Sequence, residues 1–182
     1  MKKAALLGLL ILIAAGSALA AGFRFELKGS FFSSENAIFR EVYGNSAKFG
    51  LEAGLGIVKN VSIFAGLDSM HKTGGLTVTE EEARVWITPL TAGVRYEIPA
   101  GAKFRFHGGL GVQKVFFKEE TPLGTVKENA PGYLVTGGGE YRVTDALGIG
   151  LFVTWSTCKM THEGLDFKVG GLDLGAGVEI RF

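Results

Sequence analysis

Hydrophobic and polar residues alternate with a period of two along most of this chain. The pattern is clearest at the C-terminus, where apolar residues alternate with glycine, aspartate, glutamate and arginine; the apolar ones are Leu172, Leu174, Ala176, Val178, Ile180 and Phe182. Such alternation is typical of a β-strand whose two faces meet different surroundings. About ten residues is also the length that a tilted strand needs to cross a bilayer.

Eight segments with this alternation follow one another. They are Phe23–Ser33, Ala47–Val58, Val61–Ser69, Val85–Ile98, Lys103–Phe117, Tyr133–Thr144, Leu147–Cys158 and Gly170–Phe182. Pro89, in the fourth segment, cannot donate to a strand ladder and predicts a local bulge. In the fifth, Lys114 falls on the apolar face and Val115 on the polar face, which predicts a bulge or a lysine that reaches the membrane interface. No helical run follows residue 20, so the sequence predicts an all-β fold.

The connections between these segments alternate in length. Three are short: Lys59-Asn60, Pro99–Ala102 and Asp145-Ala146. Four are long and polar: Ser34–Ser46, Met70–Arg84, Lys118–Gly132 and Lys159–Phe167. Short turns on one rim and long loops on the other predict an eight-stranded antiparallel up-and-down transmembrane β-barrel. The spacing of the hairpins would also suit propeller blades, but four blades of two strands each would be unusual.

A soluble eight-stranded barrel of the lipocalin type is the main alternative, since its length and strand count are similar. The polar face, however, is rich in glycine, which leaves room for long charged side chains in a narrow interior. Aromatic residues of the apolar face also gather near both strand ends, as two membrane-interface girdles would. Near the long loops they are Phe31, Phe49, Trp86, Phe116, Tyr133 and Trp155; near the short turns they are Phe23, Tyr96, Phe104, Tyr141 and Phe182. The membrane barrel is therefore favoured.

The N-terminus has the features of a secretory signal peptide. Lys2 and Lys3 precede an apolar run from Ala4 to Ala15, and Ala18–Ala20 forms a small-residue cleavage site. We expect residues 1–20 to be removed and residues 21–182 to form one barrel domain.

Charge and cysteine content exclude several other classes. The chain has 19 basic and 18 acidic residues, a balance that argues against a nucleic-acid partner. Cys158 is the single cysteine, so an intrachain disulfide is impossible. The three histidines, His71, His107 and His162, are dispersed and show no ligand spacing, so no metal or cofactor is expected.

Toward the short-turn end, the inward face of the predicted barrel gathers charges of both signs. They are Arg24, Glu26, Arg95, Glu97, Arg105, Glu140, Arg142, Glu179 and Arg181. Eight strands enclose room for side chains and little else, so we expect an ion-pair network that fills the lumen. An ion pathway through these charges is the alternative.

The alternation, the loop lengths and the terminal Val-Glu-Ile-Arg-Phe resemble the small eight-stranded outer-membrane β-barrels typified by the outer-membrane protein A and X barrels (OmpA/OmpX-like). The resemblance implies a bacterial outer-membrane location and periplasmic termini. It also implies contact with outer-membrane lipid, and with the barrel-assembly machinery and periplasmic chaperones during biogenesis. Val178, Ile180 and Phe182 would form the assembly signal. The implied role is non-enzymatic, either structural in the envelope or in surface interaction through four extracellular loops whose ligand the sequence does not identify.

A lipid-A-modifying enzyme and a narrow pore for small solutes are the alternative functions. Ser69 and His71 share the lipid-facing side of one strand, which is similar to the serine–histidine pair of outer-membrane lipid deacylases. Their order differs from the histidine-x-serine of that family. A serine nucleophile also needs a group that orients its base, and only Glu80, Glu81 or Glu82 could serve. A serine and a histidine at a loop edge, without catalysis, is therefore the favoured interpretation.

Overall fold

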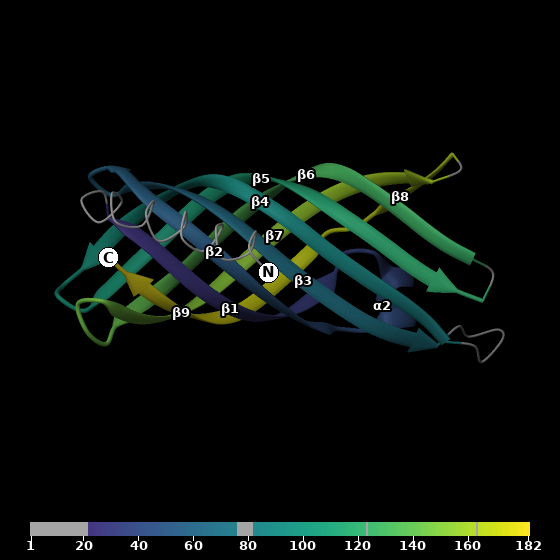
Figure 1. Ribbon diagram of the computed structural model, residues 1–182, viewed down its shortest axis with the longest axis horizontal. Helices are drawn as coiled ribbons and strands as arrows, with labels where there is room; N and C mark the ends of the chain where they lie inside the picture. The colour runs from purple at the N-terminus through teal and green to yellow at the C-terminus, as the bar shows by residue number, and fades with distance from the viewer. Residues whose placement is uncertain (1–21, 76–81, 123, 163) are drawn as a thin grey trace, which may run out of the picture.

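The computed structural model describes residues 22–75, 82–122, 124–162 and 164–182. The predicted signal peptide lies outside the described residues. The strands form one closed antiparallel barrel (Figure 1). They are β1 (Phe23–Ser34), β2 (Ser46–Val58), β3 (Val61–Gly75), β4 (Glu82–Ala100), β5 (Phe104–Thr121), β6 (Gly124–Arg142), β7 (Leu147–His162), β8 (Leu165–Lys168) and β9 (Gly171–Arg181).

The barrel wall has eight positions, because β8 and β9 lie end to end along β7. Lys159 of β7 pairs with Lys168 of β8, and Ser156 pairs with Gly171 of β9. The last strand, β9, also pairs with β1 and closes the wall. The eight-stranded all-β barrel predicted from the alternation is thereby confirmed.

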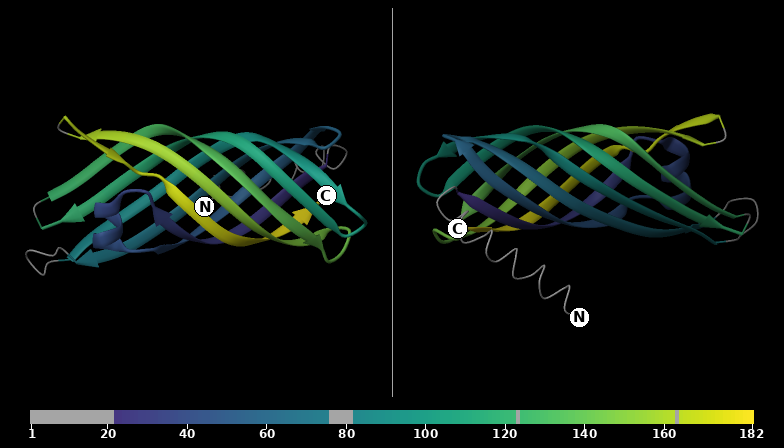
Figure 2. Two further views of the ribbon diagram at one scale, coloured as in Figure 1. Left: turned by 180° about the vertical axis from the view of Figure 1, so that it is seen from behind. Right: turned by 45° about the horizontal axis from the view of Figure 1, so that its top comes forward.

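The paired residues also define how strongly the strands are staggered. Directly paired residues can be followed from strand to strand once around the barrel, starting at Phe23 of β1. The path returns to β1 at Ser33, ten residues farther along the strand. The residues on the way are Leu55, Ile63, Val94, Leu110, Val135, Trp155 and Leu172. A stagger of this kind requires strands that tilt about 35–45° from the barrel axis. The steep diagonal course of the strands is visible in both views of Figure 2. The interior of such a barrel is filled by side chains.

The two ends of the barrel differ in construction. The C-terminus and the start of β1 meet at one end, where the Phe182 amide donates to the Phe23 carbonyl oxygen at 3.0 Å. The three short turns lie at this same end (Figure 1). We call it the short-turn end, and the opposite end the hairpin end.

Three of the four connections predicted as long loops are shorter than predicted in the described residues; their centres, residues 76–81, 123 and 163, lie outside the described part of the chain. Strands β3 to β7 continue into the segments predicted as loops, and the β5–β6 ladder extends up to the pair Thr121–Gly124. Once a strand leaves a membrane it can still pair with its neighbour, so a polar segment need not be a loop. The hairpin end therefore consists largely of paired strand rather than of free loop.

The fourth connection contains a helix that the sequence interpretation missed. Helix α2 (Ala37–Tyr43) begins after Asn36, whose side-chain oxygen accepts from the amides of Ile38 and Phe39 at 3.0 and 3.2 Å. Gly44 ends it with a φ of 64°, a conformation that glycine adopts without strain. Figure 2 shows the helix seated at the hairpin end between the strands. No helix among the described residues is long and apolar enough to cross a membrane.

Neither of the predicted bulges is present. Pairing between β4 and β5 continues in register through Pro89 and Lys114. Between β3 and β4 the ladder skips the partners of Pro89 and resumes without a register change at Met70–Ile87. The irregularity in the described ladders lies at Gly56–Val58, beside a short turn. Lys114 is exposed, with its Nζ 5.6 Å from the centre of the Phe116 ring, as expected of a lysine at the membrane interface.

The alternation keeps its register along β4 and β5, but the polarity of the two faces inverts toward the hairpin end. On β5, His107 and Gln113 point inward, and after them Val115 and Phe117 are buried with 1% and 7% exposure. The outward side chains of β5 change in the opposite sense, from apolar at Leu110 to charged at Lys118. Outside a bilayer, water is on the outer face, so apolar side chains turn to the interior. This change of surroundings explains the anomaly at Lys114 and Val115 without any bulge.

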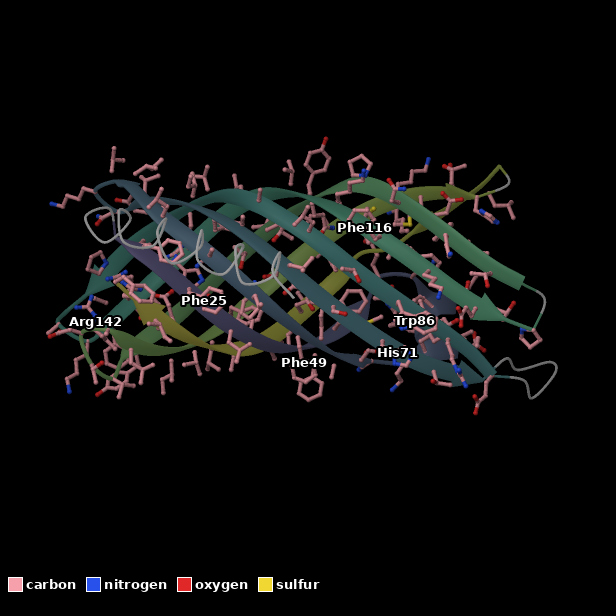
Figure 3. The ribbon with its side chains drawn as sticks, in the orientation of Figure 1. Phe25, Phe49, His71, Trp86, Phe116 and Arg142 are labelled. Carbon is pink, nitrogen blue, oxygen red and sulfur yellow. The ribbon has the colours of Figure 1, made fainter. Side chains whose placement is uncertain are left out.

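The wall between the two ends presents an apolar outer surface. Phe31, Phe49 and Tyr133 are exposed toward the hairpin end, and Phe104 and Phe182 toward the short-turn end. Figure 3 shows Phe49 pointing away from the barrel. An exposed apolar surface of this extent suits hydrocarbon rather than water as the surrounding solvent.

Candidate functional site

The lumen is the first candidate site, because its side chains decide whether anything passes. Near the short-turn end, Arg24 forms an ion pair with Glu97 and donates to the Ser62 hydroxyl at 3.0 Å. Arg105 Nη1 lies 2.6 Å from the other Glu97 oxygen. Arg24 comes from β1, Ser62 from β3 and Glu97 from β4, so this cluster spans the interior rather than following one ladder.

Two further groups of charges complete this layer. Glu52 accepts from Lys28 Nζ at 2.9 Å and from Arg95 Nη2 at 2.5 Å, and the Arg95 guanidinium lies over the Phe64 ring at 5.0 Å. Arg181 pairs with both Glu140 and Glu179. We call all three groups together the charged layer. Buried charges at this density require partners, and each of these carboxylates has at least one.

Seven of the nine residues that the sequence proposed for a lumen network take part in these pairs: Arg24, Arg95, Glu97, Arg105, Glu140, Glu179 and Arg181. Glu26 and Arg142 form no ion pair with any described residue. Glu26 lies directly opposite Glu52 and Glu179, two carboxylates, in the ladders on either side of β1. Arg142 is the last residue of β6, at the rim of the short-turn end, as Figure 3 shows.

Glycines opposite the charges make room for them. A β-carbon at Gly177 would come 2.9 Å from the Glu26 carboxyl carbon, and one at Gly138 would come 2.9 Å from the His107 ring. Contacts this short do not occur between real side chains. The glycine-rich polar face noted in the sequence is thus the space that the charged side chains occupy.

Five inward charged residues were not among the nine predicted for the network. Lys28 and Glu52 belong to the charged layer, and Lys48, Asp68 and Asp173 lie farther toward the hairpin end, where Lys48 Nζ is 2.5 Å from Asp173 Oδ2. The signal for all five was available, since each falls on the inward side of the alternation. These residues line a central cavity of about 40 Å³, large enough for a few water molecules.

A second layer seals the lumen beyond this cavity. It is an apolar cluster of buried side chains, which we call the apolar plug: Phe32, Tyr43, Met70, Ala83, Val85, Ile87, Val115, Phe117, Ala130, Cys158, Met160 and Val169. The space between this plug and Lys48 is only about 10 Å³. Cys158 is 2% exposed here and its thiol donates to the Ala130 carbonyl oxygen at 3.5 Å, so it serves as a packed side chain.

Helix α2 forms the lid of the apolar plug. Its Tyr43 ring is 4% exposed, and the hydroxyl donates to the Glu119 carboxylate on β5, across the barrel mouth. Burial, together with this hydrogen bond, raises the pKa of Tyr43, so the phenol stays protonated. A β-carbon at Gly74 of β3 would lie 2.8 Å from the Tyr43 ring, so a glycine there lets the helix approach the wall.

Ser69 and His71 do lie on the outer wall of β3, but they do not form a catalytic pair in this structure. The His71 ring stacks on the Trp86 indole with centroids 4.8 Å apart. No hydrogen bond joins Ser69 to His71, and among the described residues no carboxylate orients the imidazole. Glu80 and Glu81 lie outside the described residues, and Glu82 pairs with Arg84 instead. The geometry offers no support for a serine nucleophile.

Metal chemistry also finds no support in the described part of the chain. No group of three or more histidine, cysteine, aspartate or glutamate side chains is placed to bind an ion there. His71 stacks on Trp86 on the outer wall, His107 lines the central cavity, and His162 pairs with Glu128 at 2.8 Å at the hairpin end.

The three residues of the expected assembly signal lie on the outer face of the last strand. Val178, Ile180 and Phe182 are exposed, and the Phe182 ring packs against Phe23 at 5.9 Å between centroids. The signal therefore adjoins the seam at which β9 meets β1. Its recognition during assembly stays a prediction.

Comparisons place this architecture among known membrane proteins. No protein-family model and no curated protein sequence matches the chain. Solved structures do. The outer membrane protein OprG from Pseudomonas aeruginosa matches with a TM-score of 0.68 at 13% identity, covering 89% of this chain and 96% of that one. Neisserial surface protein A (NspA) matches with a TM-score of 0.64 at 13% identity, covering 88% of this chain and 97% of that one.

A third similar structure contains a bound ligand. It is Ail, the attachment invasion locus protein of Yersinia pestis, solved in complex with the heparin analogue sucrose octasulfate. It matches with a TM-score of 0.53 at 16% identity, covering 88% of this chain and 97% of that one. At these identities the likeness concerns the fold. The chain has the fold of the small eight-stranded outer-membrane barrels, as its resemblance to them implied.

Proposed function

We propose that this protein is a non-enzymatic barrel of a bacterial outer membrane, with a lumen closed to solutes and a set of paired hairpins presented at the cell surface. The observation that carries the proposal is the double closure of the lumen. An ion-paired layer crosses the lumen above an open pocket of about 270 Å³ at the short-turn mouth, and an apolar plug under a helical lid fills the other end. Water between them is confined to a cavity of about 40 Å³.

The outer-membrane placement rests on three properties of the barrel. Its wall is closed, so no strand edge is left unpaired in hydrocarbon. Its middle is apolar outside and polar inside. The solved structures that share its fold are bacterial outer-membrane proteins. In this placement the short-turn end faces the periplasm and the hairpin end faces outward, and the lipid of the membrane is the partner of the wall.

The hairpin end is suited to presenting a surface. Strands β4, β5 and β6 stay paired beyond the apolar outer surface of the wall, and the apolar plug packs against them from within. Ordered hairpins lose less conformational entropy on binding than free loops do. The names of NspA and of Ail describe those two proteins as a surface protein and an attachment protein.

Orientation and closure can be tested together in cells and in bilayers. With Thr125→Cys, at the exposed start of β6, an impermeant maleimide should label intact cells. The matched control Lys59→Cys, in the short β2–β3 turn, should react only after the outer membrane is opened. Purified wild-type protein in a planar bilayer should give no steady conductance. Labelling of Lys59→Cys in intact cells would refute the orientation, and steady ion-selective steps would favour the narrow pore.

The enzyme alternative is tested by lipid analysis. Cells that overproduce the protein should keep the acyl pattern of their surface lipid, with or without the substitution His71→Ala. A change in acylation that disappears with both His71→Ala and Ser69→Ala would refute the non-enzymatic role.

A further inference from the structure

Four outward side chains form a continuous row across four neighbouring strands at the hairpin end. His71 of β3 is the direct partner of Trp86 of β4, Trp86 of Lys118 of β5, and Lys118 of Lys127 of β6. The row is held together by side-chain contacts: the His71 ring stacks on Trp86, and Lys118 Nζ lies 4.6 Å from the centre of the indole ring. We call these four residues the basic row. Figure 3 shows His71 beside Trp86 near the hairpin end.

The charges of the row are not balanced within it. Lys118 and Lys127 lie directly opposite each other, and like charges in that position destabilise a pair of strands. Lys118 is paired with Glu120 at 2.6 Å, and this one carboxylate is also close enough to attract Lys127 and Arg84, so three cations share it. Lys127 forms no ion pair with any described residue, since the nearby Glu128 points to the other face and pairs with His162. An anion between the two lysines would relieve this repulsion.

The surface around the row is shaped to receive a ligand. An open groove of about 460 Å³ runs over β4, β5 and β6, with the two lysines, Trp86 and Phe116 along it; Glu128 also lines it, but its carboxylate is engaged by His162. Thr88 and Asn129 add uncharged hydrogen-bond donors. This combination of cations, donors and aromatic faces suits a phosphate attached to a larger, partly apolar molecule.

The height of the row on the wall identifies the class of ligand. One outward position below the row, Phe116 lies beside the polar Ser69, Thr88 and Asn129; one position farther down, Leu67 and Leu90 begin the apolar surface, each about half exposed. Directly above it the outward residues are Arg84 and Glu82, which suit water. The row thus lies where the apolar belt ends, at the level at which lipid headgroups meet a membrane protein.

We infer that the basic row, with its groove, binds the phosphate of an anionic lipid headgroup in the outer leaflet. This inference rests on the outer-membrane placement proposed above. Lys118 and Lys127 contact the phosphate, Trp86 packs against the headgroup, and Phe116 meets the upper part of an acyl chain. The site lies outside the barrel and is separate from the lumen. Ser69 and His71 then belong to a lipid-binding wall rather than to a catalytic one.

Trp86 provides a direct reporter of this site. The chain has two tryptophans, so Trp155→Phe leaves Trp86 as the only one. This single-tryptophan protein is reconstituted into phosphatidylcholine vesicles that contain either a diphosphorylated glycolipid or the same glycolipid without phosphate. We expect the emission of Trp86 to respond to the phosphorylated lipid alone. Lys118→Gln with Lys127→Gln should weaken the apparent affinity about twenty-five-fold, since each lysine near an anionic headgroup contributes roughly a factor of five.

A matched control and a stability measurement separate binding from folding. Lys159→Gln removes an outward lysine at the same end, one that already pairs with Asp166, and should leave the affinity unchanged. The single change Lys127→Gln should raise the urea midpoint in phosphatidylcholine alone, where it removes the repulsion from Lys118. In vesicles with the phosphorylated glycolipid it should lower the midpoint instead. If Lys127 had a purely structural role, the shift of the urea midpoint would have the same sign in both vesicle types.

The outcomes that overturn the inference are distinct from those that overturn the function. A protein that inserts into both vesicle types and responds equally to both glycolipids has no phosphate site. An equal response of Trp86 in detergent to inorganic phosphate at the same concentration would indicate a free-anion site and refute the lipid assignment. A protein that inserts into neither vesicle type refutes the outer-membrane barrel itself and the lipid site with it.

Discussion

The ion pair between Lys48 and Asp173 offers a sharp test of how the lumen is stabilised. The two side chains lie between the central cavity and the apolar plug, with Nζ 2.5 Å from Oδ2 and exposures of 12% and 3%. Asp173 also accepts from the Ser30 hydroxyl at 3.3 Å, and Lys48 Nζ lies over the Phe32 ring at 5.4 Å. Asp173→Ala therefore leaves an ammonium group in low-dielectric surroundings, next to an aromatic ring.

The expected decrease in the free energy of unfolding follows from the loss of one member of the ion pair. Breaking a buried pair by removing one charge costs about 3–5 kcal/mol, because the remaining charge is uncompensated. Replacing both members by apolar residues of similar size is often neutral. We therefore expect Asp173→Ala to lower the free energy of unfolding by about 3–5 kcal/mol, and Lys48→Met with Asp173→Leu to recover most of that loss. With a urea dependence of about 2 kcal/mol per molar, the single change moves the midpoint by roughly 2 M.

The measurement is urea unfolding of the protein in vesicles, followed by tryptophan fluorescence and by the mobility shift of folded barrels in gels. The chain offers a matched control: Lys159 and Asp166 form a lysine–aspartate pair of nearly the same length, 2.6 Å, but with exposures of 66% and 51%. Asp166→Ala should leave the midpoint almost unchanged, since solvent screens exposed pairs. Equal midpoints for Asp173→Ala and Asp166→Ala, or a double variant no more stable than Asp173→Ala, would refute the reasoning.

Three further predictions concern other parts of the molecule. Arg142→Ala should change stability by less than about 0.5 kcal/mol in the same urea assay, because no described residue pairs with it; a loss comparable to that of Asp173→Ala would show a missed partner. Tyr43→Phe should cost about 1.5–3 kcal/mol by removing the bond to Glu119, and should loosen α2 so that trypsin cleaves after the already exposed Arg40. The control Tyr133→Phe, on the outer wall, should do neither. Deletion of Phe182 should reduce the yield of folded barrel in the outer membrane, and an unchanged yield on immunoblots of membrane fractions would exclude its role in assembly.

Much of the barrel can be predicted from the sequence, since period-two alternation fixes which side chains point inward. Glu52 and Asp173 could both be placed in the lumen from their position in the alternation alone. The partner of each charge could not, because it depends on register and stagger. Arg24 and Glu97, for example, are 73 residues apart and meet only because the closed wall brings β1 and β4 face to face across the interior.

The hairpin end was harder to predict, for two physical reasons. The same alternation has opposite meanings inside and outside a bilayer, so Lys114 and Val115 looked like a defect when they mark the change of solvent. Helix α2 is only seven residues long, too short for a helical period to appear. Its caps were nevertheless visible in the sequence as Asn36 and Gly44, an N-cap residue and a terminal glycine in the expected order.

The apolar plug and the basic row belong to the same stretch of wall, and this has a consequence for binding. On β4 the inward Val85 and Ile87 flank the outward Trp86, and on β5 Phe117 precedes the outward Lys118. The inward side chains are buried, with Val85 fully enclosed. Packing on the inside therefore fixes the strands whose outer faces carry the row. A site on a rigid wall loses little conformational freedom when a headgroup binds. Closing the lumen with apolar side chains and presenting an ordered lipid site are, in this barrel, two results of the same inversion of polarity.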